Sequence, residues 1–293
     1  MPENQNSNNG RTNAILRARI LGCGSSGGVP RLGGKGGSGD WGVCDPNEPK
    51  NRRTRCSLLV ERFNINDEGS FLDDTPTRLL IDTSPDMRAQ LLNARVGTVD
   101  AVLMTHDHAD QTHGIDDLRV LALQNKARVP VYIDPHTAGA ILERFGYCFV
   151  QPEGSWYPPI LEQRPIPNYG DVFEIAGEAG PIPVVAFWQG HGGVDSLGFR
   201  CGDIAYSSDV KEISDESFEV LKGVKVWIVD ALQMKPHGSH AHLDLTLEWI
   251  DRVQPERAIL TNLHISMDYQ TLCDHLPEYI RPAYDGMTID VII

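Results

Sequence analysis

Six side chains of the metal-binding type lie just past the carboxyl ends of short apolar runs of strand length. They are His106, His108, Asp110, His191, Asp209 and His264. Strands whose carboxyl ends meet at one edge of a sheet bring the side chains beyond them to one place. Imidazole and carboxylate are the usual protein ligands of zinc and of other borderline first-row metals. The pattern therefore predicts an α/β chain built around one metal site.

The densest part of this pattern is the stretch 104–114, MTHDHADQTHG, which ends the apolar run 101–104. Alternate residues of an extended chain point the same way, so His106 and His108 can face one point, with Asp110 on the following turn. The alternative is a polar turn with incidental histidines. The further histidines and aspartates downstream argue against that alternative.

Composition limits the classes of protein to which this chain can belong. Of its 293 residues, 41% are hydrophobic and 23% are charged, which is typical of a globular protein with a substantial core. The formal net charge of −14 argues against a strong nucleic-acid binder, which normally carries a basic surface. The negative net charge does not exclude a small anionic substrate, because a metal ion and a few arginines can dominate the electrostatic field of a pocket.

The sequence contains no transmembrane run and no signal peptide, and its six cysteines include no CxxC pair. We therefore expect a cytoplasmic protein without a membrane partner, and neither a disulfide framework nor a zinc ribbon. Residues 1–13 are polar and Asn-rich, which predicts a disordered leader. Residues 14–293 are expected to form a single domain.

Short apolar runs alternate with helical segments along the rest of the chain. We expect strands at 17–21, 56–62, 78–82, 101–104, 131–133, 184–188, 197–201, 204–206, 226–230, 258–260 and 287–291, with a further one near 280. Helices are expected at 86–93, 115–124, 136–146, 245–253 and 269–275, and an extended loop at 151–167. Asp82 is expected to cap a helix or to orient another group.

Two further segments could contact a substrate. The run 49–55 is the only dense basic run, and a guanidinium suits bidentate phosphate binding, so Arg52 and Arg53 are candidate phosphate contacts. The segment 235–242 holds His237, His240 and His242 beyond a strand end. For both segments the alternative is a solvated polar turn without a role in catalysis.

The His106-x-His108-x-Asp110 motif resembles the H-x-H-x-D-H signature of the metallo-β-lactamase superfamily, and the likeness extends from about residue 17 to the C-terminus. The stretches 22–30, 49–53, 113–119 and 237–240 look like a narrower branch. That branch includes the phosphoribosyl cyclic phosphate phosphodiesterases and is related to the tRNA 3′-processing endonucleases. The resemblance implies an α/β (α+β) fold, a four-layer αβ/βα sandwich of the metallo-β-lactamase type, with metals where the two sheets meet.

The resemblance also implies roles for individual residues. His106, His108 and His191 resemble the ligands of a first metal, Asp110 and His264 those of a second, and Asp209 the carboxylate that bridges both. Gln111 stands where the motif has its last histidine, and an amide oxygen is a weaker zinc ligand than imidazole. The second site is therefore weak, prefers a harder ion such as manganese, or recruits another group such as His113. One or two divalent ions, zinc or manganese, are expected.

The predicted function is metal-dependent hydrolysis of a small cyclic or nucleotide-like phosphodiester. Asp209 would orient the attacking water, and His240 would protonate the leaving group. The partner is then a small phosphate-containing substrate, and a homodimer is left open. The alternatives are hydrolysis of a thioester, lactone or β-lactam, tRNA 3′-end processing, and a metal- or nucleotide-binding protein with little turnover.

Overall fold

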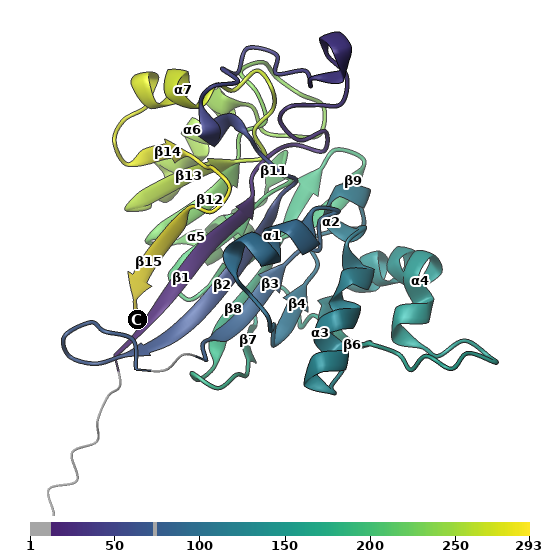
Figure 1. The fold of residues 1–293 in the computed structure, drawn as a ribbon. Coiled ribbons are helices and arrows are strands. Elements are labelled where there is room, and N and C mark those ends of the chain that lie inside the picture. The colour runs from purple at the N-terminus through teal and green to yellow at the C-terminus, as the bar shows by residue number, and fades with distance from the viewer. Residues whose placement is uncertain (1–12, 73–74) are drawn as a thin grey trace, which may run out of the picture.

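In the computed structural model, which describes residues 13–72 and 75–293, two β-sheets pack face to face with helices on both outer faces (Figure 1). This arrangement is the four-layer αβ/βα sandwich that the sequence motifs predicted, and that prediction is confirmed. The predicted leader, residues 1–13, lies outside the described residues except for Asn13. That residue begins the first strand, whereas the predicted leader included it.

The first sheet has seven strands in the order β15-β1-β2-β3-β4-β5-β6. Their bounds are β1 Asn13–Gly22, β2 Ser57–Ile65, β3 Thr77–Ile81, β4 Ala101–Leu103, β5 Val129–Ile133, β6 Leu161–Pro165 and β15 Thr288–Ile292. Strands β3 to β6 run parallel to one another. Their carboxyl ends therefore share one edge of the sheet, which is where the 104–114 stretch begins.

The second sheet has eight strands in the order β11-β8-β9-β10-β12-β13-β14, and β7 pairs with β8 beside this path. Their bounds are β7 Val172–Ile175, β8 Ile182–His191, β9 Val194–Cys201, β10 Ile204–Ser207, β11 Glu212–Ile213, β12 Val226–Asp230, β13 Arg257–Thr261 and β14 Ile280–Pro282. Strands β10, β12, β13 and β14 are parallel, so their carboxyl ends also share one edge.

Helices cover the outer face of each sheet, and a separate hydrophobic cluster lies under each helical layer. The helices over the first sheet are α1 Met87–Ala94, α3 Leu118–Asn125 and α4 Pro135–Phe149, and those over the second are α5 Asp215–Leu221, α6 Leu243–Val253 and α7 Tyr269–His275. The remaining helices are short: α2 Ala109–Thr112 and the 3-10 turns η1 Lys35–Gly37, η2 Pro49–Asn51 and η3 Ile115–Asp117. None of the helices in the described ranges is long and apolar enough to cross a membrane.

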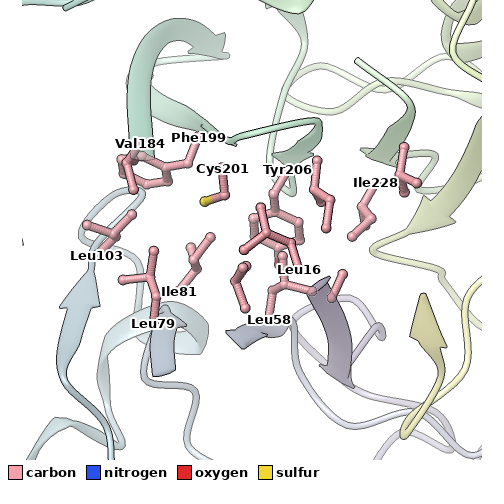
Figure 2. Close-up of a cluster of buried hydrophobic side chains, with 14 of the residues drawn as sticks. Leu16, Leu58, Leu79, Ile81, Leu103, Val184, Phe199, Cys201, Tyr206 and Ile228 are labelled. Atoms are coloured by element: carbon pink, nitrogen blue, oxygen red, sulfur yellow. The ribbon is translucent and has the colours of Figure 1, made fainter. Parts of the chain in front are cut away.

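The inner faces of the two sheets form the main core, and β1 shows why its sequence folds this way. Its residues alternate, so that Leu16 and Ala18 are fully buried between the sheets. Arg17 and Arg19 point to the other face, where Arg17 pairs with Asp290 at 2.7 Å. Figure 2 shows the resulting contact, with side chains of the first sheet opposite those of the second, among them Leu79, Phe199 and Tyr206.

The predicted elements differ from the observed ones mainly at the edges of the sheets. The strand predicted at 184–188 extends to His191, so this histidine is the last residue of β8 and does not lie beyond it. The loop predicted at 151–167 contains β6, an edge strand in which only Leu161 is buried. A strand with one buried residue lacks the alternation that a sequence pattern detects. The helix α5 and the strand β7 were also not predicted.

The inter-sheet core should dominate the free energy of unfolding. Leu79 in β3 is fully buried there, so Leu79→Ala should destabilise the protein by about 2–5 kcal/mol through lost burial and the cavity left behind. Leu92 in α1 is 62% exposed and provides the control, because Leu92→Ala should change stability by less than about 0.5 kcal/mol. Urea unfolding of both variants measures the difference, and similar losses would contradict this view of the core.

Candidate metal centre

The predicted metal ligands lie at the edge where the two sheets meet. His106 follows β4 of the first sheet, whereas His191 ends β8 and Asp209 follows β10 in the second. A backbone hydrogen bond joins the two sheets at this point, from Leu197 N in β9 to Thr105 O, at 2.9 Å. The strand ends of both sheets therefore converge on one place, as the sequence pattern predicted.

Four side chains form a compact group of potential ligands. His106, His108, His191 and Asp209 each offer one ligand atom, and these four atoms lie within 4.8 Å of one another. Asp209 Oδ2 lies 3.8 Å from His106 Nε2 and 3.8 Å from His191 Nε2. Three imidazoles and one carboxylate are a donor set that suits a divalent first-row metal such as zinc.

Hydrogen bonding fixes the ligand atom of His191. Its Nδ1 lies 2.6 Å from the carbonyl oxygen of Ser239, which can only accept, so Nδ1 carries the hydrogen and Nε2 keeps its lone pair. Burial, with help from the nearby His240, lowers the pKa of His191 to about 4. The ring is therefore neutral at physiological pH, which is the form that binds metals.

His106 shows the clearest sign that the group is built for a cation. Its Nε2 is buried and has no hydrogen-bond partner among the described residues. Its Nδ1 lies 2.9 Å from Thr105 Oγ1, which in turn lies 2.9 Å from Asp82 Oδ2. Burial lowers the pKa of His106 well below its usual value. A buried lone pair without a partner is costly, and a metal ion would satisfy it.

Asp209 is the charged member of the group, and it is only 3% exposed. Burial raises the pKa of its carboxyl well above the usual range, and the nearby Asp110, Asp230 and Asp82 add to that effect. Its Oδ1 accepts hydrogen bonds from Gln111 Nε2 at 3.1 Å and Asn262 Nδ2 at 3.4 Å. A bound cation would favour the ionised carboxylate.

His240 lies next to the four-residue group, with its ring centroid 4.5 Å from that of His191. Its Nδ1 lies 2.8 Å from Asp230 Oδ2. Burial opposes a charge on His240, but the attraction and hydrogen bond of Asp230 outweigh it and raise the pKa of His240 to about 9. The arrangement thus favours the protonated ring, whose Nε2–H could act as a proton donor.

The other predicted metal ligands lie outside the four-residue group. Asp110 and His264 do not join it, and His264 Nδ1 is hydrogen-bonded to Ser266. His113 is exposed and packs edge-on against Phe145 at 5.6 Å between ring centroids. Gln111 is fully buried and contacts Asp209.

The predicted substrate contacts have different positions. Arg53 is only 1% exposed, and its guanidinium donates to Asn51 Oδ1 at 3.1 Å, so it packs inside the protein and its contact with phosphate stays a prediction. Arg52 is exposed and stacks over the ring of Trp41 at 5.0 Å. His237 is exposed, with its ring centroid 5.3 Å from that of His240. His242 precedes α6 and has a buried Nδ1 without a partner among the described residues.

Several residues of the site were not identified from the sequence. Asp230 holds His240, Asn262 contacts Asp209, and the Ser239 carbonyl orients His191. Asp230 is the last residue of the apolar strand β12, and the candidate ligands also lie at or just past strand ends. This position could have identified Asp230 from the sequence. Asp82 does not cap α1: its carboxylate accepts from Thr105 N at 2.9 Å and thus orients the neighbour of His106.

A polar cavity of about 300 Å³ adjoins the centre. Its lining includes Thr105, next to His106, and Gly192, next to His191, together with Asp134, Tyr169 and Asp195. Neither this cavity nor a larger one of about 510 Å³, between Val172, Arg200 and Val220, is lined by the predicted site residues themselves. The smaller cavity is the one of the two that is lined by chain neighbours of His106 and His191.

Comparison with known proteins identifies relatives of the chain. A family model described as "Beta-lactamase superfamily domain" matches residues 77–265. A curated relative, an octanoyltransferase of Porphyromonas gingivalis, is 32% identical over 279 residues, covering 93% of this chain. The match covers 51% of that relative, so the chain spans about half the length of the relative it matches.

Solved structures with the same fold include a diphosphatase from the PhnP family, which is 28% identical with a TM-score of 0.79 over 95% of this chain and 98% of that one. Zinc-bound PqqB from Methylobacterium extorquens is 15% identical, with a TM-score of 0.65 over 94% of this chain and 100% of that one. The short form of human tRNase Z is 16% identical, with a TM-score of 0.59 over 93% of this chain and 98% of that one.

The contact between Thr105 and His106 should matter for metal affinity. Thr105→Val keeps the shape of the side chain but removes the hydroxyl that holds His106 Nδ1, so metal affinity should fall about 10–100-fold. Thr98→Val is the control, because the Thr98 hydroxyl contacts only Arg78 in an exposed position. Competition with a chromogenic chelator measures both affinities. Equal affinity in wild type and Thr105→Val would show that this hydroxyl does not position the ligand.

Proposed function

The chain belongs to the beta-lactamase superfamily, and we propose that this metallo-β-lactamase-fold hydrolase cleaves a small cyclic or nucleotide-like phosphodiester. The proposal rests chiefly on the His240–Asp230 pair beside the four-residue group. A charged imidazole next to a metal centre makes a locally positive site in a chain with net charge −14. Such a site suits a substrate that already carries negative charge, as a phosphodiester does and a lactone or thioester does not.

The similarity to the PhnP-family diphosphatase supports a substrate that contains phosphate. That protein is named for cleaving a diphosphate, and at 28% identity it covers nearly the whole of this chain. Three imidazoles favour zinc as the ion, with manganese as the alternative. His106, His108, His191 and Asp209 would hold it. When bound, the ion supplies a nucleophilic water at neutral pH and offsets negative charge on the phosphoryl oxygens.

The chain's own residues would orient the water and protonate the leaving group. The attacking water would form the new phosphorus–oxygen bond and release its proton to solvent, while Asp209 orients it. The bond to the leaving oxygen breaks as that oxygen takes the proton from His240 Nε2. Asp230 holds His240 through Nδ1 at 2.8 Å and stabilises its charged form until the proton is transferred.

The polar cavity of about 300 Å³ would hold the rest of the substrate. Asp134 and Asp195 in its lining disfavour a second phosphate but can accept hydrogen bonds from hydroxyl groups, as a sugar would offer. His237, close to His240, would contact the phosphate from the solvent side. Arg52 and His242 are less direct candidates for substrate contact.

The competing functions differ in the bond that is cleaved. The curated relative is named an octanoyltransferase, so hydrolysis of an acyl thioester is the main alternative, with a lactone or β-lactam, tRNA 3′-end processing and a low-turnover binding protein behind it. A panel of a chromogenic phosphodiester, a thioester, a lactone, a β-lactam and a tRNA precursor separates them. We expect the wild-type protein to turn over the phosphodiester and His106→Ala to lose this activity. Chelator-treated wild type should also lose the activity and regain it when zinc or manganese is added. Turnover of only the other substrates would reject the proposal.

His240 should matter most when the leaving group is a poor one. His240→Ala should lower kcat by about 10²–10⁴-fold for a diester with an alkyl leaving group, because the alkoxide then leaves without a proton. The loss should be much smaller for a 4-nitrophenyl leaving group, which needs little protonation. His275→Ala is the matched control, because His275 is exposed and bonded only within α7. Equal losses for both substrates would assign His240 a role other than proton donor.

A further inference from the structure

We propose that this chain binds one divalent ion instead of two, because the Gln111 amide occupies the carboxylate oxygen that a second ion would need. The inference rests on the proposed metal binding by His106, His108, His191 and Asp209. It assigns to Gln111 the role of the residue that sets the number of ions.

The two oxygens of Asp209 have different surroundings. Oδ2 faces the histidines, at 3.8 Å from the Nε2 atoms of both His106 and His191. Oδ1 faces amides and accepts from Gln111 Nε2 at 3.1 Å and from Asn262 Nδ2 at 3.4 Å. Asp209 can thus bind an ion through Oδ2. Its Oδ1 already accepts hydrogen bonds from two amide nitrogens, and these nitrogens cannot themselves bind a metal ion.

The orientation of the Gln111 amide follows from simple electrostatics. Turned the other way, the amide oxygen would face a carboxylate oxygen, and two acceptors in contact repel each other. The residue is fully buried, and its backbone is held at both ends, by Gln111 N to His108 O at 3.2 Å and by Thr83 N to Gln111 O at 2.8 Å. The amide is therefore a fixed donor to Asp209.

His264 is also hydrogen-bonded in a form that does not suit a ligand. Ser266 N donates to His264 Nδ1 at 3.1 Å, and a backbone N–H can only donate. The hydrogen of the neutral ring then lies on Nε2, so that atom presents N–H and no lone pair. His191 shows the opposite arrangement, because its Nδ1 donates to the Ser239 carbonyl and leaves Nε2 free.

The remaining candidate ligands do not assemble into a second group. In the described part of the chain, the four-residue group is the one set of three or more His, Cys, Asp or Glu ligand atoms that lie together. Asp110 and His264 do not gather with Asp209 in such a set. The Gln111 Oε1 is also buried without a partner among the described residues, but it is a single weak ligand, whereas His106 Nε2 has three other ligand atoms within 4.8 Å.

The test is the number of ions bound per folded chain. Wild type, Gln111→His and Gln111→Leu are dialysed against zinc, and separately against manganese, and the bound metal is measured by elemental analysis and native mass spectrometry. We expect one ion in wild type. Gln111→His removes the donor and supplies an imidazole, which Asp209 Oδ1 and a reoriented His264 can join, so it should take up a second ion. Gln111→Leu removes the donor without supplying a ligand and should stay at one.

Each outcome bears on the proposal. Two ions in wild type would overturn it while leaving metal-dependent catalysis intact. A folded Gln111→His protein that still binds one ion would overturn the role given to Gln111. If the wild-type protein binds no ion, as expected for His106→Ala, the proposed metal centre itself would be rejected. The wild-type count does not depend on whether a variant folds, so the proposal is decided in every case.

Discussion

Thr105 connects the two halves of the molecule at the point where the metal centre is built. Its carbonyl accepts from Leu197 of the second sheet, its N–H donates to Asp82 at 2.9 Å, and its hydroxyl lies 2.9 Å from His106 Nδ1. The position of the first sheet against the second is therefore linked directly to the orientation of a metal ligand. Because Asp82 and Thr105 are both buried, water cannot replace any of these bonds without opening the edge of the sandwich.

Burial of charge at this edge is the main energetic difficulty of the fold. Asp82, Asp209 and Asp230 are all buried close together, and burial raises the pKa of each of them. Carboxylates held in this way are destabilising unless positive charge is near. A bound divalent ion and protonated His240 would both provide that charge. Metal binding should then stabilise the folded state as well as supply the chemistry, since the ion binds only when the strand ends are assembled.

The sequence was most informative where a ligand follows its own strand. The candidate ligands His106, His108 and Asp209 could be found in this way because each lies just past a strand that ends at a shared edge of parallel strands, and His191 because it ends β8. The contacts of Asp230 with His240 and of Asn262 with Asp209 could not be predicted, because they depend on how β12 and β13 lie beside β10. The burial of Arg53 could not be predicted from the sequence either. Nothing in a basic run indicates which arginine is buried, and here the packing of Asn51 and Cys44 decides it.

The Gln111 amide and the proton on His240 both bear on how much positive charge lies near Asp209. In a centre with two ions, the second ion would neutralise Asp209 Oδ1 and part of the substrate charge. Here Gln111 and Asn262 donate to Oδ1, which satisfies that oxygen without adding a net charge. The remaining positive charge near a substrate would then come from His240, whose protonated form Asp230 stabilises. In a one-ion centre of this kind the proton donor would matter more, because His240 alone would serve the leaving group.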